Sequence, residues 1–192
     1  MNEKSVKYDI DATDAQYGKL PPQAVDVEES VLGALMLEES AYSKISSIIN
    51  YQSFYKEEHQ KIFNRIKELS DKGIPISLIQ VVQSLKDNDE LNEIGGPVKI
   101  TELTDRVSSA AHIEFWANII QQKFIQRELI RVSSEIRISA YDDTLDVSDV
   151  IGKASEKISE LFATPNSSIK TSKDLLLEMH ERIKQNYLSE NN

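Results

Sequence analysis

The 192-residue chain contains no cysteine, which excludes disulfide bonds, thiol nucleophiles and thiolate metal sites. It has no apolar run long enough to span a membrane, and residues 1–20 lack the apolar core of a signal peptide. Glycine and proline are also few, at six and five, beside a hydrophobic fraction of 40%. Such a composition favours a helical protein with a real core. We therefore expect an all-α, cytoplasmic protein without a membrane partner.

Basic residues are scarce relative to acidic ones, 22 against 32, so the formal net charge is −10. Duplex DNA is bound mainly through Lys and Arg side chains that neutralise phosphates. The segment 112–164 contains only six basic residues against nine acidic ones. We therefore expect no direct tight DNA binding and look to proteins as partners.

Motifs for chemistry are also lacking. The chain has neither the G-x-x-x-x-G-K-[ST] nor the G-x-G-x-x-G pattern of nucleotide-binding loops. Its three histidines fall on separate predicted helices, and the histidine of Glu57-Glu58-His59 lacks a second histidine one turn away, so it is expected to be a packed or surface histidine and not a zinc ligand. We expect no catalytic, cofactor-binding or metal-binding residue, and hence a non-catalytic interaction module.

Carboxylates are abundant, but none is expected to pair with a partner inside an apolar stretch. Asp26, Glu28 and Glu29 crowd the first turn of a predicted helix. Negative side chains are favourable there because the helix dipole is positive at its N-terminus. We interpret this trio as dipole compensation.

Helical periodicity fills the chain after Pro21-Pro22. Five short amphipathic helices, separated by turn signals such as Gly73 and Gly95-Gly96-Pro97, predict a compact globular body over 21–111. Ser40 and Ser77 are the expected N-caps of the second and fourth of these helices. The polar residues 1–20 are expected to form a disordered leader.

A stretch without proline or glycine, from about His112 to Ala140, predicts a helix on the order of 40 Å long. Its apolar residues form two stripes, which we interpret as a root in the body followed by a second packing surface, with the changeover near Phe124-Ile125. The alternative is a single long core helix. The first stripe comprises Ile113, Trp116, Ala117, Ile120 and Phe124; the second comprises Ile125, Leu129, Val132 and Ile136.

A short acidic turn after Tyr141 leads to a second amphipathic helix that Asp146 is expected to cap, so 112–164 is predicted to be a helical hairpin. Its reach beyond the body leaves apolar area that needs another surface, and we expect the hairpin to self-associate. The expected self-association residues are Leu129, Val132, Ile136, Ile151, Ile158 and Leu161.

Residues 165–171 have the composition of a linker, and 172–188 predicts a final helix. The apolar stripe of this helix has no predicted partner in the chain. The helix is therefore either folded back or a docking helix for a partner. The stripe consists of Leu176, Met179, Ile183 and Tyr187.

An ordered set of sequence motifs indicates a resemblance to a known protein family. The run Leu20-Pro21-Pro22-Gln23-Ala24, followed by Glu28 to Leu37 with its Val-Leu-Gly, resembles the opening of bacterial replicative DNA helicases of the DnaB family. The resemblance continues to about Phe162. It includes Ser53-Phe54-Tyr55 with His59, Ile62 and Phe63; Gly73-Ile74-Pro75-Ile76 with Leu78 and Leu85; Gly95-Gly96 with Leu103; and Ser109-Ala110-Ala111 with Ala117, Ile120, Lys123, Arg127 and Leu129-Ile130. Ser108, His112 and Trp116 depart from the usual Pro, Asn and Tyr.

The resemblance implies the N-terminal domain of such a helicase: a helical body plus a hairpin. In the family these domains pair into a collar, a trimer of dimers, that sits on six RecA-like motor domains and binds primase. The helix 172–188 would be the linker helix that docks on the motor domain of a neighbouring subunit. ATP and Mg²⁺ would belong to the motor domain, which is absent here, so unwinding would not be an activity of this chain. A helicase loader is a further candidate partner. Primase is loosely expected on Arg137, Tyr141 and Asp142.

Two alternatives stay open from the sequence. One is a stand-alone mimic of this domain that regulates or loads a helicase. The other is the helicase-binding domain of a primase, which has a similar architecture; the Pro-Pro opening followed by Glu-Ser-Val-Leu-Gly argues against it. An enzyme is expected only if the full-length product continues into a P-loop ATPase.

Overall fold

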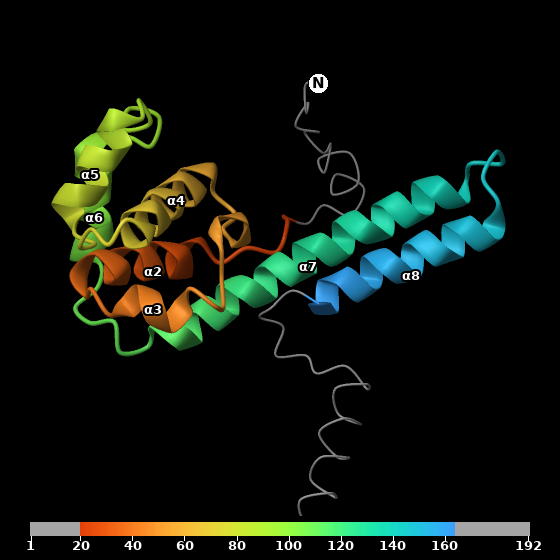
Figure 1. The fold of residues 1–192 in the computed structure, drawn as a ribbon, viewed down its shortest axis with the longest axis horizontal. Helices are drawn as coiled ribbons and strands as arrows, with labels where there is room; N and C mark the ends of the chain where they lie inside the picture. Colours follow the sequence, from red (N-terminus) through yellow and green to blue (C-terminus); the bar gives the residue numbers. More distant parts are fainter. Residues whose placement is uncertain (1–19, 164–192) are drawn as a thin grey trace, which may run out of the picture. The chain divides into compact units, whose positions relative to one another are not determined.

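A computed structural model of the protein describes residues 20–163, in which every regular element is helical, as predicted (Figure 1). The elements are α2 (Val25–Leu37), α3 (Ala41–Ile45), the 3-10 turn η1 (Tyr51–Ser53), α4 (Glu57–Asp71), α5 (Leu78–Asp87), α6 (Gly96–Asp105), α7 (Ile113–Ala140) and α8 (Val147–Ala163). They form two compact units, called here the first unit (described over 20–135) and the second unit (described over 136–163). The division falls inside α7.

Helix α2 is the centre of the first unit, where it packs against α3, α4, α5 and α6 (Figure 1). After its first turn, its sequence is almost entirely apolar, and residues 31–36 are all buried. A helix that is apolar all round belongs in an interior. Helix α2 was expected to be amphipathic like its neighbours, but beyond its first turn residues 31–36 are buried among α3, α4, α5 and α6.

The boundaries of α4 and α5 follow the predicted signals. Gly73 takes a φ of 67°, and the Ile74 N–H donates to the Leu69 carbonyl at 2.9 Å, which closes the C-terminus of α4 as a Schellman motif does. Ser77 caps α5 by accepting from the Gln80 N–H at 3.4 Å. The predicted cap of α3 is wrong: the Ser40 hydroxyl donates to Glu38 Oε1 at 2.8 Å and makes no cap bond.

Sequence periodicity missed the 3-10 turn η1. The Asn50 side chain accepts from the Gln52 N–H at 2.8 Å, and the Asn50 N–H donates to Ser53 Oγ at 3.1 Å, a reciprocal capping arrangement. The turn delivers Phe54 to the core, where its ring centroid lies 4.9 Å from that of Phe63. The same turn also contacts α7 through Ser53.

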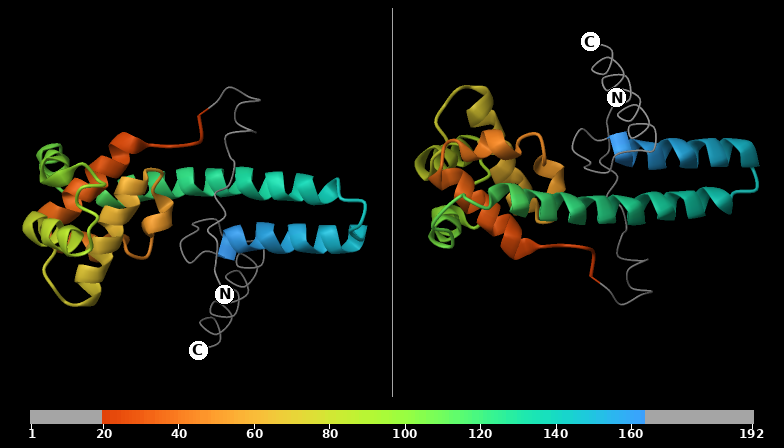
Figure 2. Two further views of the ribbon diagram at one scale, coloured as in Figure 1. Left: turned by 90° about the horizontal axis from the view of Figure 1, so that it is seen from above. Right: turned by 90° about the horizontal axis from the view of Figure 1, so that it is seen from below.

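Helices α7 and α8 begin and end within one residue of the expected positions, and Asp146 caps α8 by accepting from the Ser148 N–H at 2.7 Å. In the turn between them, visible from two sides in Figure 2, Asp142 Oδ1 accepts from the N–H and the hydroxyl of Thr144. The Thr144 donors hold the pKa of the Asp142 carboxyl below its usual value. The leader 1–19, the linker 165–171 and the helix expected over 172–188 lie outside the described residues.

Candidate assembly site

The first turns of α7 are rooted in the core of the first unit. Ile113, Ala117 and Ile120 are fully buried there, and Trp116 packs against the core from its edge. Phe124, the last member of the predicted stripe, is half-buried. The first stripe of the long helix therefore serves as the predicted root.

Polar contacts hold α7 to the first unit beyond this apolar root. The Ser53 hydroxyl donates to Gln121 Oε1 at 3.2 Å. Arg127 donates to the Pro22 carbonyl at 2.9 Å and to the Ser53 carbonyl at 2.7 Å. The predicted changeover at Phe124-Ile125 therefore comes too early, because α7 still contacts the segments around Pro22 and Ser53 at Arg127.

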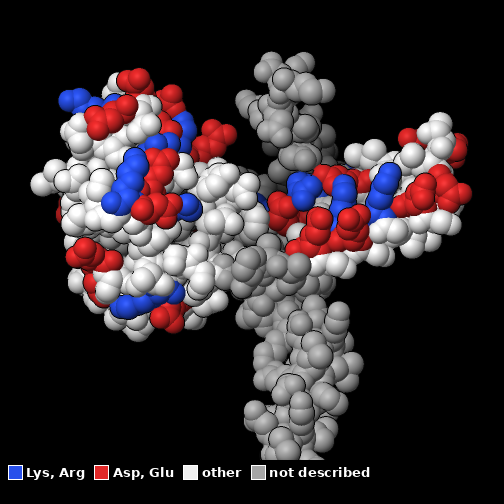
Figure 3. Space-filling view, in the orientation of Figure 1, with Lys and Arg blue, Asp and Glu red and all other residues white. Residues whose placement is uncertain are grey.

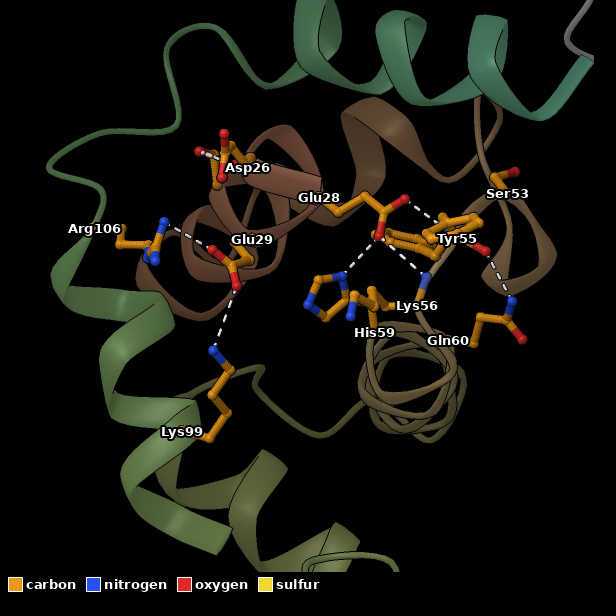
Figure 4. Close-up of polar contacts among 12 residues, drawn as sticks. Asp26, Glu28, Glu29, Ser53, Tyr55, Lys56, His59, Gln60, Lys99 and Arg106 are labelled. Atoms are coloured by element: carbon orange, nitrogen blue, oxygen red, sulfur yellow. Dashed lines mark hydrogen bonds and ion pairs between the residues drawn. The ribbon is translucent and has the colours of Figure 1, made fainter. Parts of the chain in front are cut away.

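The acidic residues at the start of α2 do more than compensate a dipole. Glu28 is buried, and its carboxylate accepts from His59 Nδ1 at 2.7 Å and from the Tyr55 N–H at 2.7 Å (Figure 4). The Glu28 carboxylate lies beside the N-terminus of α4, where the N-cap residue Lys56 supplies no side-chain cap. The expectation that no carboxylate pairs inside an apolar stretch is therefore wrong, and of the two environments expected for His59, packed or at the surface, the structure shows the packed one.

Glu29 is also buried and reaches the opposite way, to α6 and the segment after it (Figure 4). Its oxygens lie 2.8 Å from Arg106 and 3.4 Å from Lys99. Dipole compensation remains the interpretation for exposed Asp26 alone. Glu28 and Glu29 instead tie α2 to α4 and α6.

The last part of α7 in the first unit carries the first expected self-association residues. Leu129 is 43% exposed, whereas Val132 is buried in the single chain. Between them, Arg131 pairs with Glu128 and Glu135 at 2.7 and 2.6 Å, which keeps charged groups beside the apolar positions. Leu129 is the expected residue of this unit that a second copy could reach.

Helix α8 in the second unit has two neighbouring apolar faces. Val150, Ala154 and Leu161 are half-buried, whereas Val147, Ile151 and Ile158 are 72%, 61% and 40% exposed. We call the latter three the α8 apolar stripe. Of the expected residues, Ile151 and Ile158 lie on this stripe, and Leu161 and the α7 residue Ile136 are half-buried.

The residues expected to contact primase lie at the end of α7 and in the following turn. Arg137 is exposed, Tyr141 is 84% exposed, and Asp142 accepts the Thr144 bonds described above. Figure 3 shows basic and acidic side chains interleaved over the visible described surface, without a broad basic patch. The linker-helix residues Leu176, Met179, Ile183 and Tyr187 lie outside the described residues.

Two general features of the described part bear on its chemistry. No cluster of three His, Asp or Glu side chains within 20–163 is arranged to hold a metal ion. None of the helices in that range is both long and apolar enough to cross a membrane. The features that stand out are the exposed apolar positions on α7 and α8 and the polar contacts that anchor α7.

Comparison with known proteins identifies the family of this chain. The family model described as "DnaB-like helicase N terminal domain" matches residues 20–122. "Replicative DNA helicase DnaC" of Bacillus subtilis is 36% identical over 90% of this chain, and "Replicative DNA helicase DnaB" of Geobacillus stearothermophilus is 35% identical over 86%. The chain spans only 38% and 37% of the lengths of these two relatives.

Solved structures agree with the sequence matches. The N-terminal domain of DnaB helicase from Mycobacterium tuberculosis is 27% identical, with a TM-score of 0.70 over 73% of this chain and 99% of that one. A DnaB-like replicative helicase, solved with its interactions with primase, shares the fold with a TM-score of 0.64 at 18% identity, over 84% of this chain and 36% of that one. The model match covers more than half of the chain and begins at the Pro-Pro opening. The chain therefore belongs to the DnaB-like helicase N-terminal domain family.

Proposed function

We propose that this chain is the N-terminal part of a replicative DNA helicase, in which it joins helicase subunits and docks primase. It has no catalytic role of its own. ATP-dependent unwinding, with its ATP and Mg²⁺, belongs to a RecA-like motor domain outside these 192 residues. The family match and the replicative helicases among the relatives support this assignment.

The observation that carries the proposal is the α8 apolar stripe. Val147, Ile151 and Ile158 lie within about 40° of one another around the helix axis, so they form one surface. Single exposed apolar residues are ordinary on soluble proteins, whereas an aligned group marks an interaction site. The stripe gives a second copy an apolar surface to cover, and Leu129 on α7 is a separate exposed apolar position in the first unit.

The family match supports three further proposed roles. The paired domains form a collar, a trimer of dimers, above the motor ring. The segment 172–188 serves as the linker to the motor domain, and its apolar residues Leu176, Met179, Ile183 and Tyr187 dock on the motor domain of a neighbouring subunit. A helicase loader is a further partner of the assembled ring.

Self-association is tested by placing a charge on the α8 apolar stripe or at Leu129 on α7. We expect Ile151→Glu and Leu129→Glu to convert the associated species to monomer while far-UV circular dichroism keeps the helical signal. Burying an isoleucine side chain contributes about 1.5–3 kcal/mol, so the dissociation constant should rise at least about 10-fold, and more because a carboxylate must also be desolvated. Sedimentation velocity over a concentration series measures the shift.

Ile79→Glu is the matched control. Ile79 lies on α5 and is 73% exposed, so the same substitution there adds the same charge away from the stripe. Its sedimentation should equal that of the wild type. A wild-type chain that stays monomeric at the highest attainable concentration, or an Ile79→Glu variant that dissociates equally, would contradict the proposed surface.

Primase docking is tested at the turn between α7 and α8. Exposed tyrosine and arginine are the side chains most often dominant in protein interfaces, and losing one costs about 2 kcal/mol or more. We expect Tyr141→Ala and Arg137→Ala each to weaken binding of the cognate primase at least about 10-fold. Titration calorimetry with primase measures this, with Ile79→Ala as the control. Unchanged affinity in both variants would place primase elsewhere.

The family match favours a helicase domain over the helicase-binding domain of a primase. The stand-alone mimic differs from the helicase fragment only in whether the native gene continues into a P-loop ATPase. Sequencing that gene beyond the codon for residue 192 therefore separates these two.

A further inference from the structure

Arg127 has an unusual set of partners for a half-buried arginine. Its guanidinium donates to two main-chain carbonyls, those of Pro22 and Ser53, which are 105 and 74 residues away in the chain. The rings of Tyr55 and Phe124 flank it, with centroids 5.7 and 5.8 Å from Cζ. Burial lowers the pKa of this guanidinium below its usual value, and nearby Glu28 opposes that effect.

Three other arginines in the described part bond differently. Arg65, Arg106 and Arg131 each pair with carboxylates. A carboxylate is carried on a flexible side chain and can follow an arginine that moves. A carbonyl is part of the backbone, and the planar guanidinium donates in a fixed fork, so two carbonyl bonds define the position of the arginine closely. Arg127 therefore fixes α7 against two separate backbone segments.

The place of Arg127 along α7 gives this contact its importance. The last α7 residue in the hydrophobic core cluster of the first unit is Ile120, so this core does not itself reach Arg127, two turns further along. Gln121 contacts the same η1 turn through the Ser53 hydroxyl. Ser53 is thus held at both its hydroxyl and its carbonyl by α7, six residues apart on that helix.

We propose that Arg127 is a positioning residue that fixes the direction in which α7 continues from the first unit, and so the direction in which the second unit is presented to a second copy. The consequence for assembly rests on the proposed self-association; the effect on direction does not. A helix anchored only through Ile120 could pivot about that point, whereas a second anchor two turns further along prevents pivoting.

Spin-label distances test the proposal directly. The chain lacks cysteine, so Val98→Cys on α6 and Ser155→Cys on α8 can be labelled uniquely; both positions are exposed. Labelled full-length chain is diluted into an excess of unlabelled chain, so that only distances within one chain are measured. We expect a narrow distribution for the parent and a broadened or displaced one for Arg127→Gln. Arg127→Lys should be intermediate, since one ammonium cannot reproduce the planar fork.

The matched control is Lys123→Gln, one turn earlier on α7, because Lys123 bonds only to Gln126 of the same helix. It removes the same charge and should leave the distribution narrow. Circular dichroism and the emission of Trp116, the sole tryptophan, check that each variant stays folded. The proposal is overturned if folded Arg127→Gln and Arg127→Lys both keep the parental distribution, or if the parent is itself broad.

Sedimentation of the same variants separates the two proposals. If Ile151→Glu fails to dissociate the chain, the self-association surface is wrong whatever the distances show. If Ile151→Glu dissociates it and Arg127→Gln leaves the distances unchanged, only the role of Arg127 is wrong. We expect Ile151→Glu to dissociate the associated species. We expect Arg127→Gln to broaden the distribution of sedimentation coefficients.

Discussion

Replacing Glu28 by alanine should lower the free energy of unfolding of the first unit by about 3–5 kcal/mol, the range measured when one partner of a buried polar pair is removed. Glu28 is 1% exposed and accepts from both His59 Nδ1 and the Tyr55 N–H. Without it the buried His59 Nδ1 and the part-buried Tyr55 N–H lose this acceptor, and with it their compensation for desolvation. The substitution also removes the side chain that faces the start of α4.

Urea unfolding followed by Trp116 emission measures this change, because Trp116 packs against the core of the first unit. Glu28→Gln should retain part of the stability, since an amide oxygen can still accept from one of the donors. Glu58→Ala removes an exposed glutamate from the first turn of α4 and should change stability by less than about 0.5 kcal/mol. A Glu28→Ala variant as stable as Glu58→Ala would show that the pair with His59 contributes little.

The burial of Glu28 could have been inferred from the sequence. Val31, Leu32 and Leu35 follow it at three, four and seven residues, so all four side chains share one helical face. That spacing places the carboxylate in the core, where it needs a partner. Its partner could not be found this way, because His59 lies 31 residues along the chain and local periodicity carries no information about that distance.

Periodicity and turn residues predicted which segments are helical and where the helices begin and end. The bounds of α4, α7 and α8 illustrate this. The error in α7 concerns where it parts from the first unit. Apolar spacing indicated Phe124-Ile125, whereas the arginine at 127 anchors the helix through its long side chain. Hydrophobic patterns cannot register an anchor made of hydrogen bonds to carbonyls.

The surface of α8 shows another limit of sequence patterns. Val150 and Ile151 are adjacent and similarly apolar, yet one is half-buried and the other is 61% exposed. The sequence predicted an amphipathic helix here, and both residues fall on its single apolar side. Residue type alone cannot distinguish a side chain covered within its own unit from one left open, and that difference selects the residues for the association experiment.

The family resemblance included Gly33 within its Val-Leu-Gly motif, and the structure gives this glycine a physical reason. Gly33 lies where α2 crosses α6. A Cβ at this position would lie 2.1 Å from the Leu103 carbonyl oxygen and 2.7 Å from Val107 Cγ2. Real Cβ contacts are essentially never closer than 3.0 Å, so a side chain there would force the two helices apart.

Gly33→Ala should therefore destabilise the first unit although alanine is the better helix former. Overpacking costs about 1–3 kcal/mol, and a clash with backbone favours the upper end, because a carbonyl cannot rotate away as a side chain can. The gain in helix propensity is about 1 kcal/mol, so we expect a net loss of about 2 kcal/mol. Urea unfolding followed by Trp116 emission measures it, with a blue or red shift of native emission if the crossing reorganises.

Gly152→Ala on α8 is the matched control for this change. Gly152 is also helical, but a Cβ there would meet nothing within 4 Å, so only the propensity term remains. This variant should keep its helical signal to a higher temperature and stabilise the second unit by up to about 1 kcal/mol. If Gly33→Ala lowers the free energy of unfolding and Gly152→Ala raises it, the loss at Gly33 is caused by the close α2–α6 crossing. Stabilisation at both positions would mean that α6 can move aside, and that the close approach of the two helices is not required for the fold.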